Sequence, residues 1–313
     1  MKIQNKGKQH CLCKVMLLYL FCAVFPVSTA FTFAQPRMVI VYPKVREPYL
    51  SVFEDIASGA EKGFNGSSVR VAIEEGQSAR RLLAQYDNSI VLALGSRASN
   101  ELVGESFSYP LVSGAVGKRV QNSFGLTMLP DPKVIAEKVP LLSPWVKEVH
   151  VIRKKNGNYI DLTQAHEFLI EKSISLIIHE AVDIRSAAAI YRQLAKTLGE
   201  SQALWILPDG SYANNAILAM ILEAAWKKNF VVFSSSPIHV KRGALFSVYP
   251  NNFEMGASLG RIVSDVADGI LKDPHMESLQ DVFVAVNERT SNHLGIMITD
   301  DMKEHIDLVL PAR

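Results

Sequence analysis

Residues 174–207 read ISLIIHEAVDIRSAAAIYRQLAKTLGESQALWIL. The stretch opens with the apolar run ISLIIHEA and closes with ALWIL, and runs of this kind are typical of strands buried on both faces. Between them, apolar side chains recur at helical spacing over residues 184–198, which predicts an amphipathic helix. A strand, a helix and a second strand in this order predict two parallel strands joined by a right-handed crossover.

The same alternation continues toward both ends of the chain, so the predicted fold class is α/β with parallel sheets. Two similar halves are expected, with a junction near Ser143, Pro144 and Trp145. We predict further strands at 37–42, 69–74, 89–95, 109–112, 149–153 and 230–234, and further helices at 48–64, 79–86, 160–172, 214–229 and 252–271.

Composition narrows the class of protein. The 313 residues include 33 Lys+Arg and 31 Asp+Glu, for a formal net charge of +2. Proteins that hold nucleic acid are expected to carry a basic face, so this balance argues against a nucleic-acid partner. Hydrophobic residues make up 48% of the chain, which supplies a sizeable core and argues against intrinsic disorder.

The first 34 residues have the pattern of a secretory signal. They contain lysines but no acidic residue, then an apolar run at 15–25, then small residues with candidate cleavage after Ala30 or Ala34. The alternative is a membrane anchor, but the run falls short of the ~20 residues that span a bilayer, and Pro26 interrupts it. We expect a cleaved signal peptide at 1–34, a periplasmic location and a mature chain that does not span a membrane.

Catalytic and metal-binding motifs are weak. All three cysteines lie within the expected signal, which leaves the mature chain without a thiol. No G-x-G-x-x-G run follows a strand, no P-loop is present, and the histidines are scattered. We therefore expect no enzyme activity, no cofactor and no metal site. A hydrolase whose Ser, His and Asp side chains meet only in the folded chain stays open as an alternative.

Polar loops follow the predicted strands. Ligands of open α/β sheets bind beyond the carboxyl ends of the strands, where helix N-termini favour a carboxylate and an Asp favours an ammonium group. These loops suit a small polar or zwitterionic ligand, although Ser, Gly and Asp are also ordinary turn and cap residues. The loops are KVRE at 44–47, SRAS at 96–99, SGAVG at 113–117, DGSY at 209–212 and SSS at 234–236.

Six motifs in the second half carry a family resemblance. They are ALWILPD at 203–209, LEAAW at 222–226, VVFS at 231–234, VKRGAL at 240–245, YPNNFEMG at 249–256 and VNERTSNHLG at 286–295. The sequence resembles the substrate-binding proteins of ABC transporters, including the tryptophan- and tyrosine-binding type. The resemblance implies a type I periplasmic binding protein fold, in which two Rossmann-like lobes with parallel sheets are joined by three crossover segments and enclose a ligand cleft.

The resemblance also implies lobe boundaries and site residues. The N-terminal lobe is expected at 35–145 with 250–275, and the C-terminal lobe at 146–249 with 276–313. The implied ligand-binding residues are Ser96, Ser113, Asp209, Ser211, Ser234 and Asn251.

The implied function is that of a periplasmic solute-binding protein. It would capture a small polar, amino-acid-like molecule between the lobes and deliver it to an ABC permease, because a ligand that contacts both lobes stabilises the closed form. Lys44, Arg46 and Lys118 depart from the family pattern and either favour an acidic ligand or are solvated. The alternative partner is a membrane sensor kinase, to which the same fold would report the ligand.

Overall fold

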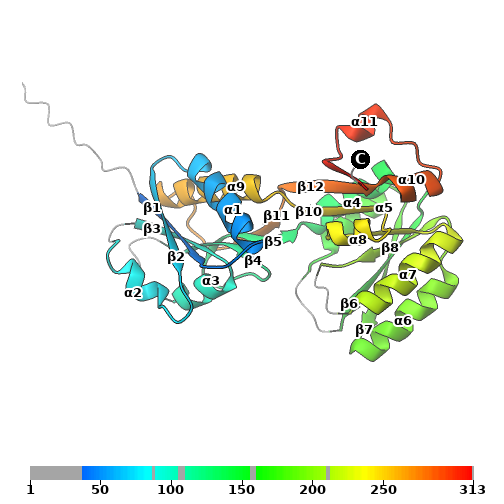
Figure 1. Cartoon of the computed structure of the whole chain (residues 1–313), viewed down its shortest axis with the longest axis horizontal. Helices are drawn as coiled ribbons and strands as arrows, with labels where there is room; N and C mark the ends of the chain where they lie inside the picture. Colours follow the sequence, from blue (N-terminus) through cyan, green and yellow to red (C-terminus); the bar gives the residue numbers. More distant parts are fainter. Residues whose placement is uncertain (1–36, 87–88, 105–109, 156–159, 209–211, 312–313) are drawn as a thin grey trace, which may run out of the picture. The chain divides into compact units, whose positions relative to one another are not determined.

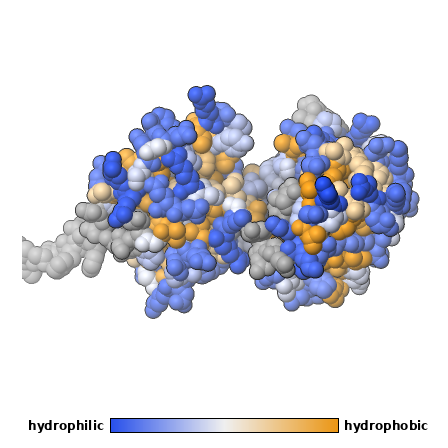
Figure 2. All heavy atoms as spheres, turned by 90° about the horizontal axis from the view of Figure 1, so that it is seen from below, coloured by the Kyte–Doolittle hydropathy of each residue, from blue (hydrophilic) through white to orange (hydrophobic). Residues whose placement is uncertain are grey.

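The computed structural model describes residues 37–86, 89–104, 110–155, 160–208 and 212–311, and the expected signal peptide lies outside this part of the chain. Within these ranges, no helix has both the length and the apolar character needed to cross a bilayer. Figure 2 shows hydrophilic residues over much of one face, with hydrophobic areas between them. Scattered apolar surface is normal for a folded chain because polar groups are too few to cover it.

The first sheet has six strands in the order β11-β5-β4-β3-β1-β2 (Figure 1). Every pairing in it is parallel. The strands are β1 (Arg37–Pro43), β2 (Ser67–Ile73), β3 (Ser89–Leu94), β4 (Val112–Val116), β5 (Phe124–Pro130) and β11 (Met276–Leu279). All six residues of β3 are buried, which confirms that a continuous apolar run here marks a strand covered on both faces.

Helices cover both faces of the first sheet. Helices α1 (Tyr49–Gly63) and α9 (Asn252–Ala267) lie side by side on one face, as Figure 1 shows, and share one apolar core with the strands. Helices α2 (Ala79–Leu83) and α3 (Ser96–Leu102) contribute to the core on the other face. The predicted helix at 252–271 is confirmed as a core-covering helix up to Ala267, whereas Ile270 lies beyond its end and is 66% exposed.

The second sheet has seven strands in the order β13-β12-β10-β9-β8-β6-β7. All pairings are parallel except that of β10 with β12, which is antiparallel. The strands are β6 (Glu148–Lys154), β7 (Ser175–Ala181), β8 (Gln202–Ile206), β9 (Val231–Ser234), β10 (Phe246–Pro250), β12 (Val282–Asn287) and β13 (Leu308–Leu310).

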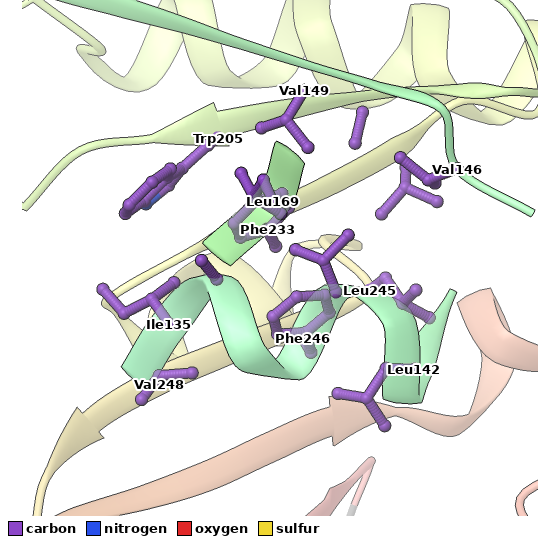
Figure 3. Close-up of a cluster of buried hydrophobic side chains, with 14 of the residues drawn as sticks. Ile135, Leu142, Val146, Val149, Leu169, Trp205, Phe233, Leu245, Phe246 and Val248 are labelled. Atoms are coloured by element: carbon purple, nitrogen blue, oxygen red, sulfur yellow. The ribbon is translucent and has the colours of Figure 1, made fainter. Parts of the chain in front are cut away.

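The core of the second sheet is rich in aromatic side chains. Trp205, Phe233 and Phe246 come from three neighbouring strands and stack on one another (Figure 3). Helices α4 (Pro132–Leu142) and α5 (Thr163–Glu171) close this core. The other face is covered by α6 (Ile184–Thr197) and α7 (Asn215–Lys228), and the short helices are α8 (Pro237–Lys241), α10 (Glu288–His293) and α11 (Asp300–Lys303).

In the part of the chain that the structure describes, the backbone passes between the two sheets three times: between β5 and α4, between β10 and α9, and between β11 and β12. The first passage lies at Pro130–Pro132, earlier than the junction expected at 143–145, because the apolar face of α4 belongs to the second core. Strand β11, expected with the C-terminal lobe, pairs with β5 in the first sheet.

Candidate functional site

The loops at the carboxyl ends of β1, β2 and β3 are bonded to one another. Lys44 forms an ion pair of 2.7 Å with Glu74, and this ammonium lowers the pKa of the Glu74 carboxyl. The Arg97 guanidinium donates to the backbone oxygens of Glu74 and Gln77 at 3.1 and 3.5 Å. Both members of the ion pair are largely exposed, so its contribution to stability is small. Two of the basic side chains of this edge therefore already have partners.

A cavity of about 260 Å³ lies close to the passages between the sheets. It is lined from the first sheet by the loop after β4, by β5 and by β11, and from the second by the start of α4 and the loop before α5. The lining residues are Gly117, Lys118, Arg119, Thr127, Leu129, Pro130, Pro132, Ile160, Asp161 and Ser278.

Charges of opposite sign face this cavity. Lys118 and Arg119 supply two cations, and Asp161 supplies a carboxylate. Asp161 accepts hydrogen bonds from the Thr163 hydroxyl at 2.7 Å and the Thr163 backbone N–H at 2.9 Å. These bonds, with a smaller effect from Arg119, lower the pKa of Asp161 and keep it ionised at neutral pH. Such a site can bind a carboxylate at one end and an ammonium group at the other.

A second cavity of about 390 Å³ shares Ile160 and Asp161 with the first. Its wall includes Arg153, which pairs with Glu180 at 2.7 Å. His166 of α5 also lines it. Because the two cavities meet at Asp161, this residue is accessible from both.

Three of the serines predicted as ligand contacts, Ser96, Ser113 and Ser234, lie outside the two cavities. Ser96 is the exposed first residue of α3. Ser113 is fully buried in β4 and accepts a hydrogen bond of 2.8 Å from the Ser123 hydroxyl. Ser234 is 1% exposed at the end of β9 and accepts from the Ser236 backbone N–H at 3.2 Å. None of these three serines lines either cavity.

The other predicted contacts are Asn251, Asp209 and Ser211. Asn251 is the N-cap of α9, where its side chain accepts the Glu254 backbone N–H at 3.2 Å, and it lines neither cavity. Asp209 and Ser211 lie outside the described residues. A ligand role for these residues stays a prediction.

Reasoning from sequence missed Asp161 and Arg119 as site residues. Asp161 lies two residues before Thr163, a pattern that signals a helix start rather than a ligand. Arg119 adjoins Lys118, which the sequence did single out as a basic departure. Arg119 and Asp161 are 42 positions apart in the chain, so no local sequence pattern indicates that they line the same cavity. Within the described ranges, no group of three His, Cys, Asp or Glu side chains could hold a metal ion.

The three passages between the sheets are hydrogen-bonded together. The backbone N–H of Asp131 donates to Leu279 O at 2.8 Å, and that of Asn251 donates to Asp281 O at 3.0 Å. The Gln280 amide donates to the Asp131 carboxylate at 3.0 Å. Any movement of one sheet relative to the other must therefore act on these hydrogen-bonded passages beside the cavity.

Solved structures with similar folds cover most of the chain. A structure from Streptococcus pneumoniae in complex with L-Trp is 15% identical, covers 88% of this chain and 100% of its own, and has a TM-score of 0.54. A ligand-free, open substrate-binding protein with adhesive properties from Clostridium difficile is 15% identical, with coverages of 87% and 98% and a TM-score of 0.63. A conserved domain protein from Vibrio cholerae is 18% identical, with coverages of 88% and 100% and a TM-score of 0.53.

These likenesses confirm the predicted fold class, an α/β protein with two parallel-sheet lobes of the type I periplasmic binding protein kind. Comparison with curated proteins finds no match. Residues 65–309 match the family described as ABC transporter substrate binding protein, a family of binding proteins rather than enzymes. Since the match spans most of the chain and the fold agrees with it, this protein is a member of the ABC transporter substrate-binding protein family.

Proposed function

We propose that this protein binds a small zwitterionic, amino-acid-like molecule in the cavity at Arg119 and Asp161 and delivers it to an ABC permease. The observation that supports this most strongly is the pairing of charges across the cavity. Two cations come from the loop after β4, and one carboxylate comes from the loop before α5. Membership of a family of transporter binding proteins is in keeping with this role, as is a cavity lined by the first sheet together with α4 and the loop before α5 of the second region.

The proposed binding mode follows from the charges. Lys118 and Arg119 bind the carboxylate of the ligand, since guanidinium groups match carboxylate geometry. Asp161 binds the ammonium group, and its lowered pKa keeps it ionised. The volume of about 260 Å³ lies just under the usual range for ligand pockets, which favours a ligand of amino-acid size. The Streptococcus pneumoniae relative was solved with L-Trp, an amino acid.

Delivery of the ligand to the permease follows from a difference in the ligand's affinity for two arrangements of the protein. A ligand that contacts residues of both sheets stabilises only the arrangement that brings those residues together. The permease then meets a surface that the unliganded protein presents less often. Ser96, exposed at the carboxyl end of β3, and the predicted contacts Asp209 and Ser211 remain candidates for further contacts with the same ligand.

The test is a calorimetric titration of the protein with individual amino acids and dicarboxylic acids, which gives the Kd of each. In thermal melting, a ligand at a hundredfold excess over its Kd should raise the free energy of unfolding by about 2.7 kcal/mol. Asp161→Asn and Arg119→Gln should each weaken binding at least about tenfold, the equivalent of about 1.4 kcal/mol.

The matched control is Asp183→Asn. Asp183 is the N-cap of α6 and accepts a hydrogen bond of 2.7 Å from the Ser186 backbone N–H, much as Asp161 accepts one from the backbone N–H of Thr163 at the start of α5, but Asp183 lines neither cavity. It should leave ligand affinity unchanged. If Asp183→Asn weakens binding as much as Asp161→Asn, or if ligands bind normally to the Asp161 and Arg119 variants, the proposed site is wrong.

We also propose that the protein is exported to the periplasm and cleaved within residues 1–34. The supporting pattern is the lysine-containing start, the apolar run and the small residues before Phe31 and Gln35. N-terminal sequencing of protein recovered from the periplasm should find Phe31 or Gln35 as the first residue. Recovery of the chain with Met1 intact would contradict cleavage.

A further inference from the structure

A cavity of about 940 Å³ lies away from the candidate ligand site. It is lined by α7, the end of α8 and the turn after it, α10 and the end of β13. Apolar side chains form part of its wall, among them Leu222, Trp226 and Leu310. Lys241, Arg242 and Arg289 add three cations. This cavity shares no lining residue with the one at Asp161, so the two are separate.

Neutral partners position two of the three cations. Arg242 donates to the Asn215 side-chain oxygen at 2.6 Å. The Arg289 guanidinium carbon lies 5.2 Å from the centre of the Trp226 ring. That ring also stacks on His293 at 3.7 Å, and the His293 imidazole bonds to the Trp226 carbonyl at 2.8 Å. These contacts hold the guanidinium groups in place and leave their charge intact.

The turn that carries the other basic side chains is also anchored. The Asn287 amide donates to Val240 O at 2.7 Å, and the Thr290 hydroxyl donates to Gly243 O at 3.1 Å. Lys241 and Arg242 lie between these two anchor points, and both are exposed. The backbone of the turn is therefore fixed, and of its two basic side chains only that of Lys241 needs to order when a ligand binds.

The positive charge of the cavity is not balanced by carboxylates. Among the described residues that line it, Glu223 is the one acidic residue, and it already forms an ion pair of 2.5 Å with Lys227. Within the described ranges, no ion pair joins Lys241, Arg242 or Arg289 to an acidic side chain. Preorganised cations without counter-charges favour an anionic partner.

We propose that this cavity, formed around Trp226 and Arg289, docks an acidic peptide segment of a partner protein that also carries an apolar side chain. Trp and Arg are enriched among the residues that dominate protein interfaces, and Trp226 is 40% exposed although it is held rigidly. Carboxylates of the segment bind the three cations, and its apolar side chain packs against Leu222 and Trp226. The mixed lining favours such a segment over a compact anion, which would use only the charges.

The probe is the fluorescein-labelled peptide Glu-Asp-Leu-Glu-Asp-Leu, titrated with the purified protein and followed by fluorescence anisotropy. A matched peptide carries Gln and Asn in place of Glu and Asp. The triple variant Lys241→Gln, Arg242→Gln, Arg289→Gln removes the cations. The control triple variant Arg185→Gln, Arg192→Gln, Lys196→Gln removes the same charge from exposed positions on α6.

The acidic peptide should bind saturably, and the amide peptide should not. The cavity triple variant should lose at least about tenfold in affinity, whereas the α6 control should retain it. All six positions are exposed, so circular dichroism and thermal melting should show both variants folded. The absence of saturable binding, or an equal loss in the two triple variants, would overturn the proposal. Displacement by citrate at concentrations as low as those of unlabelled peptide would also overturn it, since a compact anion would then suffice.

Discussion

The hydrophobic cores of the two sheets are packed in different ways. In the first, α1 and α9 approach so closely that a Cβ on Gly59 would lie 1.9 Å from Phe253 O, and one on Gly256 would lie 2.1 Å from Ile56 O. In the second, volume comes from large rings: Phe233 lies 5.7 Å from Trp205 and 4.8 Å from Phe246, centre to centre.

This difference shows that burial alone does not say which change a core tolerates. The helix pair of the first core has no room for a single added carbon, because backbone atoms occupy the space. The aromatic core of the second is filled by side chains, so its weakness is lost volume. Substitution to alanine is therefore expected to destabilise the first core by a steric clash at its helix-pair glycines. In the second core it should destabilise by leaving a cavity where an aromatic ring is removed.

The largest effect should come from Phe233→Ala. Phe233 is fully buried between two other aromatic rings, so its removal should lower the free energy of unfolding by about 3–5 kcal/mol. Urea denaturation measures the change. The control Tyr49→Ala removes an aromatic ring that is 68% exposed and should shift stability by no more than about 0.5 kcal/mol. Similar losses from both variants would contradict the aromatic-core account.

Gly59→Ala should have the next largest effect and lower the free energy of unfolding by about 1–3 kcal/mol. The added methyl group meets the Phe253 carbonyl, and relief requires that α1 and α9 move apart. Gly199→Ala is the control, since a Cβ there would have no atom within 4 Å and its φ is not in the left-handed region. That variant should be neutral or slightly stabilised. An equally tolerant Gly59 would show that the helices are less closely packed than described.

A smaller effect is expected at the passages between the sheets. Asp131 caps α4 by accepting the Lys133 backbone N–H at 2.8 Å, and it also accepts from Gln280. Asp131→Ala should cost about 1 kcal/mol, the usual value of a lost helix cap. Gln280→Ala removes only the side-chain bond between passages and should cost clearly less in the same urea measurement. A larger loss from Gln280→Ala would assign the stability to the passage rather than to the cap.

The smallest expected effect is a difference in pH response. Burial lowers the pKa of His150 and of His179 in the second sheet, where their rings are hydrogen-bonded at 3.0 Å. The unfolded chain then binds more protons near its ordinary histidine pKa of about 6.5, so this region loses stability as pH falls from about 7. The Asp273 backbone oxygen and then Glu277 raise the pKa of His275, which adjoins β11 of the first sheet, so its contribution is present at low pH and is lost as pH rises.

Thermal melting between about pH 5 and 7.5 tests this contrast. His179→Gln should flatten the acid loss of stability, because one of the two rings whose burial, nearly complete for His150 and partial for His179, opposes protonation is gone. His275→Gln should make the loss slightly steeper, because it removes a contribution of the opposite sign. If the two variants shift the profile in the same direction, the assigned pKa directions are wrong.

Local pattern was sufficient for some elements and insufficient for others. Strand β3 and helix α6 were predicted within about two residues, because a continuous apolar run and a clear helical period leave few alternatives. Helix α4 and strands β5, β10, β11, β12 and β13 were not predicted. Strand β11 has only four residues and reads MESL, which carries no clear strand pattern. It is a strand because it pairs with β5.

The fold class, the alternation of strands and helices and the family resemblance all followed from the order of residues, since periodicity and strand composition act over short distances along the chain. Folding brings Arg119 of one loop and Asp161 of another to a common cavity, and it places Ser113 and Ser234 in the interior. The sequence predicted polar loops after the strands, but residues 113–116 of one such loop belong to the buried strand β4, and no pattern indicated which side chains line the cavity. That depends on the three passages and on packing between residues far apart in the chain, which carry no local signal.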